Sequence, residues 1–276
     1  MHNNRSFHFV AVNYNNSKLT FSYIESIISL GFKNYNIFIV DNDSNEKDIC
    51  ELEEFCNKYP HTFLIKNNEN IGYFSALNVG LKQIKRGSDD YVIIGNNDLT
   101  FQADFIEKID SILITDDVLV ISPNIITQDN IHQNPHIVNK FNLVQRIYRK
   151  IYYSNYYVSI ILQFFYSILK FLKGGSNRKL NDKIIPIWAG YGACYILTPS
   201  FFKHFERLDA PVFLMGEELI IAAQVLRVEG IILYHPDLVV NHLDHASIGK
   251  IESKFLYGLS QTSYRYYIKN EGIIQK

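Results

Sequence analysis

Four short polar groups in the first hundred residues each follow an apolar run, and together they could bind a nucleotide. They are Asn13-Tyr14, Asp41-Asn42, Asn70-x-Gly72 and Asn96-Asn97-Asp98. Carboxylate and amide side chains can pair with the edge of a base and with ribose hydroxyls. Carboxylates can also hold the divalent cation that accompanies a diphosphate. If the four groups meet in space, the sequence predicts a site for a nucleotide diphosphate.

Two of these carboxylates suggest specific contacts. Asp41 can only accept hydrogen bonds when ionised, so it could pair with the N3–H of uracil or thymine. Asp98 could supply an oxygen ligand to Mg²⁺ or Mn²⁺. Both residues have a simpler interpretation, because Asp41 could cap the turn at 41–44 and Asp98 could cap a turn or a helix. Gly72 permits a close backbone approach, or it only ends the loop before a helix.

The elements that must position these groups follow from the apolar pattern. Continuous apolar runs predict four buried strands, at 7–12, 35–40, 62–66 and 91–94. Helical spacing between them predicts helices at 19–30, 48–59 and 72–84. Strands that alternate with helices indicate an α/β fold with an open, twisted and mainly parallel sheet, flanked by helices on both faces. The polar groups then lie at the carboxyl ends of the strands, where such sheets bind ligands.

A pair of acids in the second half of the chain could supply a general base. Glu217-Glu218 follows the apolar segment 212–216 and begins a predicted helix. One carboxylate of such a pair can ionise while its neighbour stays protonated or orients a substrate. The alternative is an exposed acidic pair that the helix dipole favours. His242 follows a further apolar run; taken alone, it could equally be a packed or surface histidine.

These segments, taken in order, resemble the motifs of family 2 of the inverting glycosyltransferases. The similar segments are 12–16, 40–44, 68–80, 95–99, 188–197, 213–230 and 239–247. Individually each is a weak signal, but the order is specific. The resemblance implies the GT-A fold, in which a nucleotide-binding half-sheet joins an acceptor-binding half. It also implies transfer of a hexose or rhamnose from a nucleotide-diphosphate sugar, UDP- or dTDP-linked, in the assembly of a bacterial surface polysaccharide such as a capsule or O-antigen.

The resemblance assigns donor-side roles residue by residue. Asp41 would contact the pyrimidine, and Asn96 and Asn97 would lie by the ribose and diphosphate. Asp98 matches the last position of an Asp-x-Asp-like metal motif whose first position is Asn96 here. His242 would complete the site for Mn²⁺ or Mg²⁺, with His245 as a rival. Further substrate-binding residues are expected within the same motifs: Asn13, Tyr14, Asn70, Gly72, Asn78, Trp188, Gly192 and Ala193.

On the acceptor side, Glu217 and Glu218 match the family's Glu-Asp pair, whose second member is the usual catalytic base. Glu replaces Asp at that position, so the choice between Glu218 and Glu217 stays open. The base would take the proton of an acceptor hydroxyl. The acceptor is expected to be a glycan, and a lipid-linked one.

A basic, aromatic insert at about 140–183 interrupts the α/β pattern. The stretch 151–172 is long enough to span a bilayer but contains too many polar residues to do so. Tyrosines and phenylalanines flanked by Lys and Arg favour peripheral membrane contact through 144–173. A helical cover on the core, or a dimer surface, is the alternative.

Composition limits the remaining options. The chain has 276 residues and a net charge of −1, so no global field attracts it to nucleic acid. Its three cysteines show no disulfide or zinc spacing. We expect one domain over 1–276, comprising a nucleotide-sugar half (1–116), an acceptor half (117–250) and a C-terminal helix (251–276). The polar N-terminus resembles no signal peptide, so we expect a cytoplasmic protein at the inner face of the plasma membrane.

Two competing functions deserve comparison. A nucleotidyltransferase would usually begin with a glycine-rich basic loop after its first strand, and segment 12–19 has no glycine. A catalytically weak glycan-binding or scaffold protein on a transferase fold would have lost acids such as Asp98 and Glu218, which this chain keeps.

Overall fold

The computed structural model describes residues 5–172, 182–243 and 253–274. Its strands are β1 (Phe7–Asn13), β2 (Tyr35–Asp41), β3 (Thr62–Lys66), β4 (Tyr91–Asn96), β5 (Leu99–Phe101), β6 (Val118–Thr127), β7 (Ile185–Ile187), β8 (Cys194–Leu197) and β9 (Ile231–His242). Its helices are α1 (Ser17–Ser29), α2 (Glu46–Cys56), α3 (Tyr73–Leu81), α4 (Phe105–Ser111), α5 (Leu143–Tyr152), α6 (Tyr156–Leu172), α7 (Phe201–His204), α8 (Glu217–Leu226) and α9 (Ser253–Ile274).

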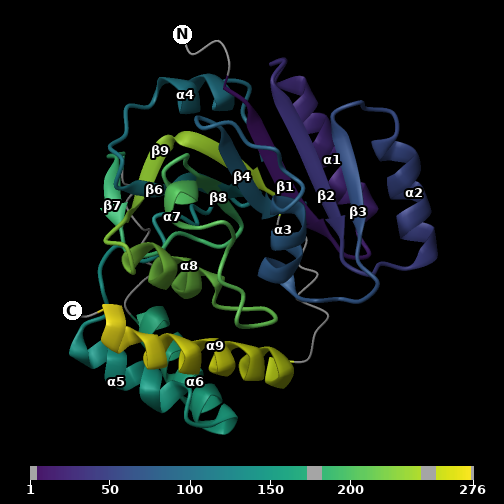
Figure 1. Cartoon of the computed structure of the whole chain (residues 1–276). Coiled ribbons are helices and arrows are strands. Elements are labelled where there is room, and N and C mark those ends of the chain that lie inside the picture. Colours follow the sequence, from purple (N-terminus) through teal and green to yellow (C-terminus); the bar gives the residue numbers. More distant parts are fainter. Residues whose placement is uncertain (1–4, 173–181, 244–252, 275–276) are drawn as a thin grey trace.

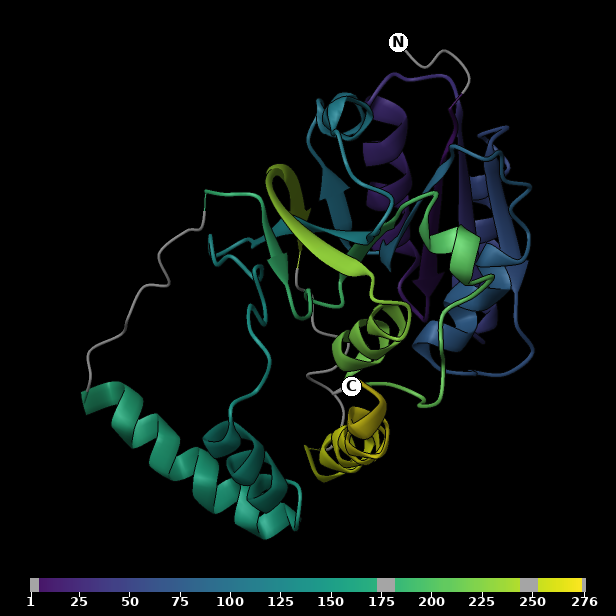
Figure 2. The same ribbon diagram turned by 60° about the vertical axis from the view of Figure 1, so that its left-hand side comes forward.

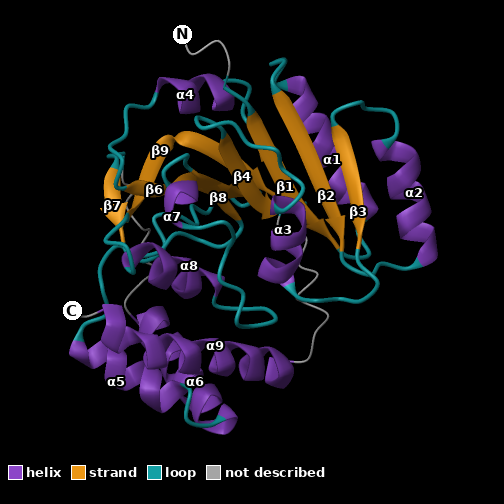
Figure 3. Ribbon diagram, in the orientation of Figure 1, coloured by secondary structure: helices purple, strands orange, loops and turns teal. Residues whose placement is uncertain are grey.

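Within these residues the strands form one open sheet in the order β3-β2-β1-β4-β8-β6-β9-β5, and β7 pairs with β9 (Figure 3). The four strands predicted from apolar runs are β1 to β4, and they pair in parallel. This confirms the predicted α/β class. β8 was not predicted as a strand; it lies antiparallel between β4 and β6.

The register of the parallel strands brings their polar ends together. Asn13 at the end of β1 lies beside Asp41 at the end of β2. On the other side of β1, Val12 lies beside Asn96 of β4. Because parallel strands end at the same sheet edge, the register creates the convergence that the sequence predicts.

Helices cover both faces of the sheet. On one face α1, α2 and α4 contribute buried residues such as Ile24, Leu52 and Phe105 to a core cluster. On the other face α3, α7 and α8 do so with residues such as Leu77 and Ile221 (Figure 1). Both clusters draw strand residues from the two expected halves of the chain, so the halves share one sheet and its core.

β9 is longer than the sequence suggested. The apolar run predicts a strand at 231–234, but the strand continues to His242. A shift of register between Pro123 and Asn124 accommodates the extra residues 236–238 within the pairing to β6, since Pro123 pairs with His235 and Asn124 with Val239. This bulge carries the strand past Pro236 and delivers His242 to the same edge as Asn96.

The insert and the C-terminal segment form a separate helical layer. Figure 2 shows the α5–α6 pair standing away from the sheet, with α9 beside it. The predicted helical insert is thus confirmed for its described part, although the stretch 151–172 is broken between α5 and α6; residues 173–181 lie outside the described residues. No helix in the described ranges is both long enough and apolar enough to cross a membrane.

The packing of α3 on the sheet generates a stability prediction. A Cβ atom at Gly80 would lie 2.5 Å from Cγ1 of Val10 and 3.0 Å from Cγ2 of Val40, both buried. We expect Gly80→Ala to lower the free energy of unfolding by about 1–2 kcal/mol, because overpacking outweighs the better helix propensity of Ala. Urea unfolding measures this change.

Gly258 on α9 is the matched control. It is also helical, but a Cβ atom there would meet nothing within 4 Å. Gly258→Ala should raise the free energy of unfolding by roughly 0.5–1 kcal/mol. Equal effects at the two glycines would contradict the close packing of α3.

Candidate active site

Asn13 is the hub of the strand-end network. Its side chain is fully buried, and its amide nitrogen donates to Oδ1 of Asp41 and Oδ2 of Asp48, both at 2.8 Å. Its carbonyl oxygen accepts from the Thr20 hydroxyl at 2.9 Å and from Asn97 at 3.3 Å. The structure therefore places Asn13 beneath the predicted site, where it holds β1, β2 and α1 together.

Asp41 is equally buried. One carboxylate oxygen accepts from Asn13 and the other from the backbone N–H of Ser44 at 3.0 Å, so Asp41 does cap its own turn. Each oxygen keeps a further lone pair, and contact with a pyrimidine stays a prediction. Tyr14, one residue after β1, is 48% exposed and is accessible to a ligand.

Asn42 organises the next loop, a role that the sequence did not reveal. Its amide nitrogen donates to Oδ1 of Asn70 at 2.8 Å, and its carbonyl oxygen accepts from the N–H of Ile71 at 3.2 Å. Asn70 also accepts from the N–H of Gly72 at 3.1 Å. These bonds fix the loop that leads into α3.

Gly72 and Asn78 tie this loop region to the second half of the chain. Gly72 has φ +86°, and a Cβ atom there would lie 2.3 Å from the carbonyl oxygen of Phe213. The predicted close approach therefore exists, but to the chain's own backbone. Asn78 pairs with both backbone groups of Leu208, at 2.9 and 2.8 Å. Its side chain is thus committed to holding the segment before α8.

Asn96, Asp98 and His242 meet at the end of β4. Oδ1 of Asp98 lies 3.2 Å from Nε2 of His242, and Nδ2 of Asn96 lies 3.4 Å from the same nitrogen. The pairing of β5 with β9 aligns Leu99 with His242 and so fixes this meeting. Asn97 points the other way, donating to the Thr20 hydroxyl at 2.7 Å. Of the two adjacent asparagines, only Asn96 joins the predicted metal ligands.

The donor set fits a divalent cation. Nδ1 of His242 lies 2.8 Å from the side-chain oxygen of Gln133, an arrangement that makes Nδ1–H the donor and leaves a lone pair on Nε2. That lone pair faces Oδ1 of Asp98, which is buried and has no hydrogen-bond partner. Two acceptors 3.2 Å apart are suited to a positive charge between them.

The protein would supply only part of the coordination. Among the described residues, no group of three or more His, Cys, Asp or Glu side chains is placed to hold a metal. Mg²⁺ and Mn²⁺ commonly use one or two protein ligands and take the others from phosphate and water. His245 lies outside the described residues.

The acidic pair begins α8 after a constrained turn. Met215 and Gly216 both have left-handed backbones, with φ +73° and φ +88°. The hydroxyl of Ser263 on α9 donates to the carbonyl of Met215, and the N–H of Met215 donates to Oε1 of Glu217 at 2.9 Å. The turn thus bends Glu217 back onto its own loop.

Glu218 reaches across to the segment before β8. Its Oε1 accepts from the N–H of Gly192 at 3.2 Å. Burial raises the pKa of the Glu218 carboxyl, against the lowering effect of the backbone hydrogen bonds. Burial also raises the pKa of Glu217 to about 7; the charge of Glu218 adds to this rise and the Met215 amide opposes it. Glu218 is the more accessible of the two, since Glu217 is only 8% exposed.

The segment Gly192-Ala193 connects the two clusters. Ala193 accepts from the backbone N–H of Asn96 at 2.9 Å, while Gly192 donates to Glu218. Beside them, the ring of Tyr191 lies 6.3 Å from that of His242. The structure therefore brings Asn96, Asp98, His242, Gly192, Ala193 and Glu218 into one contiguous site.

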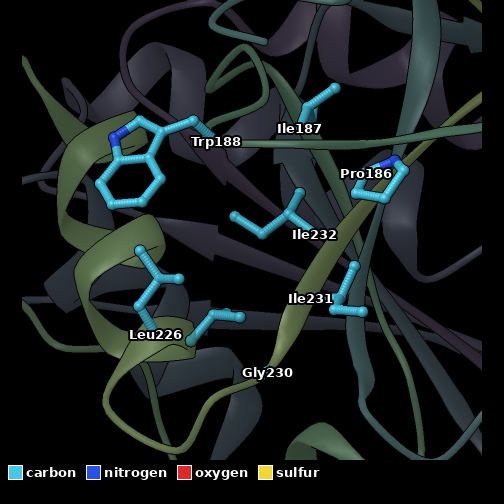
Figure 4. Close-up of a pocket in the computed structure, with 8 residues that line it drawn as sticks. Pro186, Ile187, Trp188, Leu226, Gly230, Ile231 and Ile232 are labelled. Carbon is cyan, nitrogen blue, oxygen red and sulfur yellow. The ribbon is translucent and has the colours of Figure 1, made fainter. Parts of the chain in front are cut away.

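Trp188 lies elsewhere. It lines an apolar cavity of about 150 Å³ on the C-terminal half of α8, beside β7 and β9 (Figure 4). The other lining residues are Pro186, Ile187, Val225, Leu226, Gly230, Ile231 and Ile232. The sequence grouped Trp188 with Gly192 and Ala193, but this cavity lies at the opposite end of α8 from Glu218.

Three contributors escaped the sequence analysis. Gln133 orients His242 from 109 residues away, Ser263 holds the turn before the acids, and Tyr73 has a buried hydroxyl with no hydrogen-bond partner. Burial raises the pKa of Tyr73 well above its usual range, and the charges of Glu217 and Asp98 add to the effect. Tyr73 stands in the segment 68–80 that resembled the family, but nothing local distinguishes it from a packing residue.

Comparison with protein families matches residues 9–171 to glycosyl transferase family 2, which is more than half of the chain. The chain belongs to this family. The matched part includes the strand ends and Asp98 and stops before Glu217, Glu218 and His242. A curated relative, the minor teichoic acid biosynthesis protein GgaB of Bacillus subtilis (strain 168), is 39% identical over 61 residues; these make up 21% of this chain and 7% of GgaB.

Solved structures of glycosyltransferases share the fold, as the GT-A expectation requires. GalNAc-T7 with UDP, GalNAc and Mn²⁺ has a TM-score of 0.57 and 13% identity, over 90% of this chain and 45% of that one. S. aureus TarS 1-349 has a TM-score of 0.56 and 12% identity, over 86% of this chain and 60% of that one. The mannosyltransferase PcManGT of Pyrobaculum calidifontis with GDP-Man and Mn²⁺ has a TM-score of 0.55 and 12% identity, over 99% of this chain and 73% of that one. This family member thus spans about half of GalNAc-T7 and a small part of GgaB.

The raised pKa of Glu217 predicts a pH-dependent cost to stability. The unfolded chain ionises this carboxyl near its ordinary value of 4.5, whereas the folded chain keeps the proton up to about 7. The folded state therefore binds more protons between these values, and stability falls as pH rises through the window. Compared with the original chain, Glu217→Gln should have a free energy of unfolding that is higher by up to about 3 kcal/mol above pH 7, and nearly the same at pH 4.5.

Urea unfolding over this pH range measures the difference. Glu69→Gln is the control, because Glu69 is exposed in the loop before α3. A difference between Glu217→Gln and the original chain that stays constant with pH would refute the raised pKa.

Proposed function

We propose that this chain is a metal-dependent glycosyltransferase that moves a sugar from a UDP- or dTDP-sugar to a glycan acceptor with inversion. The observation that carries the proposal is the contiguous site between β4 and α8. At one end Asp98 and His242 present two facing acceptors, and at the other Glu218 is held on the N–H of Gly192. This placement of the polar groups suits a reaction in which one end of the site binds a diphosphate and the other end removes a proton.

The donor side supports a nucleotide-diphosphate sugar. Buried amide and carboxylate groups line the ends of β1, β2 and β4, and the exposed Tyr14 stands beside them. The related folds GalNAc-T7 and PcManGT were solved with UDP and with GDP-Man, each with Mn²⁺. By analogy of fold, we place the pyrimidine nucleotide along these strand ends and the transferred sugar near Gly192 and Ala193.

Asp98 and His242 would hold Mn²⁺ or Mg²⁺, with Asn96 beside them. When bound, the cation would neutralise the charge that builds on the departing diphosphate. Gln133 contributes by keeping the proton on Nδ1 of His242, so that Nε2 stays available as a ligand.

Glu218 is the proposed base. Its raised pKa makes it a stronger base than an exposed carboxylate, and its partial exposure lets an acceptor hydroxyl reach it. Glu218 takes the hydroxyl proton while the oxygen attacks the anomeric carbon and the bond to the diphosphate oxygen breaks. Attack opposite the leaving group inverts the configuration. Glu217, turned back onto Met215, would stay protonated near neutral pH and limit the repulsion between the two acids.

The acceptor belongs to bacterial surface polymer assembly. The relative GgaB is a minor teichoic acid biosynthesis protein, and TarS shares the fold. We propose a glycan of this class, lipid-linked and met at the cytoplasmic face of the plasma membrane. The transferred sugar is a hexose, an N-acetylhexosamine or rhamnose.

A donor screen tests the reaction. The chain is incubated with UDP-, dTDP- and GDP-sugars, Mn²⁺ and a lipid-linked acceptor pool, and nucleotide release is measured. We expect turnover of one pyrimidine-nucleotide donor, lowered about 10²–10⁴-fold by Glu218→Gln because the base is lost. Turnover should fall as pH drops through the raised pKa of Glu218, since only the ionised carboxylate accepts a proton.

Glu69→Gln again serves as the control and should keep full turnover. If turnover is lost in Glu217→Gln but not in Glu218→Gln, Glu217 is the base and Glu218 its neighbour. A folded chain that binds acceptor but turns over no donor would favour the glycan-binding scaffold.

Cation binding tests the metal site separately. In the presence of UDP, Mn²⁺ affinity measured by calorimetry should fall at least about tenfold in both Asp98→Asn and His242→Gln, since each removes a ligand or its charge. Asp43→Asn, which removes an exposed charge from the turn after β2, should bind Mn²⁺ normally. Unchanged affinity in the two site variants would rule out this pair as ligands.

A further inference from the structure

The helices α5 and α6 expose a broad apolar surface. α5 has no buried residue, and its large apolar side chains other than Tyr152 are at least 40% exposed. We call the exposed set the apolar face. It consists of Leu143, Val144, Ile147 and Ile151 on α5, and Tyr157, Ile160, Ile161, Phe164, Phe165 and Ile168 on α6. Tyr148 and Tyr166 are also exposed but interact with each other between the two helices, so they are not counted in this face. So many exposed large apolar side chains on two packed helices are uncommon on a surface with no partner.

The spacing shows that the face is built into both helices. On α6 the residues fall at intervals of three and four, from Tyr157 through Ile161 and Phe164 to Ile168, so they share one side. On α5 a capping box between Asn142 and Gln145 fixes the start of the helix. The amphipathic arrangement therefore does not depend on a partner to create it.

α9 fixes the base of the pair while leaving the apolar face uncovered. Tyr153 stacks on Tyr264 with ring centroids 4.5 Å apart, and Gln261 donates to the carbonyl of Tyr153 at 2.7 Å. Tyr257 donates to the carbonyl of Tyr152 at 3.0 Å. Figure 2 shows the α5–α6 pair projecting beyond α9 and away from the sheet.

The charged residues in this stretch of the sequence have one sign. No Asp or Glu occurs between Asp129 and Asp182, while eight basic residues do. Three of the eight, Arg146, Arg149 and Lys150, lie on α5 beside its apolar side chains. The guanidinium of Arg149 packs over Phe141, 3.9 Å from the ring centroid, so the basic side of α5 is also ordered.

We propose that the apolar face of α5 and α6 inserts into the interface of an anionic lipid bilayer, with the basic residues on lipid headgroups. An amphipathic helix with Lys and Arg beside aromatic residues binds such surfaces. Helices in the described ranges cannot span the bilayer, so the pair lies along it. A second copy of the chain is disfavoured as occupant, because a two-fold interface would bring the same acid-free, basic surfaces together.

The contact would also place the membrane near the acids. Ser263 of α9 contacts the turn Met215-Gly216 that precedes Glu217 and Glu218. The helix that fixes the α5–α6 pair is therefore the one that supports the catalytic turn. This step rests on the proposed function: a lipid-linked acceptor held in the bilayer would present its sugar beside α8.

Vesicle co-sedimentation of the full chain tests the surface without any sugar substrate. We expect binding to vesicles of phosphatidylcholine with phosphatidylglycerol at least about tenfold tighter than to phosphatidylcholine alone, and weaker at high salt. Phe164→Glu should weaken binding at least about tenfold, because it removes apolar area and places a charge in the interface. Lys150→Gln should weaken it about fivefold.

Tyr166→Glu is the matched control. Tyr166 and Phe164 lie on the same helix with nearly equal exposure, 63% and 62%, but on opposite sides. The control variant adds the same negative charge away from the apolar face, so it should weaken vesicle binding by no more than about fivefold. Circular dichroism and donor turnover with a soluble acceptor confirm that each variant is folded.

The possible results of these experiments distinguish a lipid bilayer from a second copy of the chain as the partner of the apolar face. Equal loss in Phe164→Glu and Tyr166→Glu, or no binding to either vesicle, would overturn the proposal. Concentration-dependent dimers by light scattering, abolished by Phe164→Glu and accompanied by no vesicle binding, would assign the face to a second copy. Vesicle binding by a chain that turns over no donor would support this surface and reject only the proposed reaction.

Discussion

The burial of polar side chains at the ends of β1 and β2 depends on the hydrogen bonds of Asn13. A buried carboxylate without partners would lose several kcal/mol of solvation, and Asp41 is fully buried. Asn13 and the Ser44 amide replace that solvation, and the parallel register sets Asn13 beside Asp41. Thr20 and Asn97 extend the network to α1 and β4. This edge of the sheet is therefore preorganised by the same bonds that hold the strands together.

The second half of the chain is attached to that edge mainly through backbone groups. The carbonyl of Phe213 accepts from Tyr73, the backbone of Leu208 pairs with Asn78, and that of Ala193 pairs with Asn96. Backbone contacts demand close approach, and this explains why Gly72 carries no side chain. Rigid ties of this kind fix the distance between the proposed metal ligands and the acids, which the proposed reaction requires.

Sequence reasoning succeeded where a pattern is local. The strands β1, β2 and β4 are almost wholly buried, so each is a continuous apolar run that ends in a polar residue. The edge strand β3 was found from its apolar run too, although its Phe63 is 43% exposed. Sequence reasoning failed where geometry comes from distant pairing. β8 is only four residues long and follows a glycine-rich turn, and β9 crosses Pro236 only because β6 shifts register opposite it. Likewise Gln133 acquires its role solely through contact with His242.

For the site residues, the sequence predicted where most of them lie better than it predicted which partners their side chains contact. Asp98 and His242 do meet, yet Asn13, Asn78 and Asn97 use their amides within the chain, and Trp188 lies on an apolar cavity. Asn suits both tasks, because it can bind a ligand or cap and link backbone segments. A sequence cannot separate these uses, since the deciding partner, such as Leu208 for Asn78, lies 130 residues away.

The acidic pair shows how one turn can give two neighbouring carboxyls different chemistry. Left-handed backbone at Met215 and Gly216 lets the Met215 N–H reach Glu217, while Glu218 extends to Gly192. With separate donors and unequal exposure, the two acids need not ionise together, and repulsion between them favours one proton at neutral pH. The longer Glu side chain at position 218 suits this arrangement, because it must span from α8 to the segment before β8. A shorter Asp there would need the two elements to lie closer to keep the hydrogen bond to the Gly192 amide.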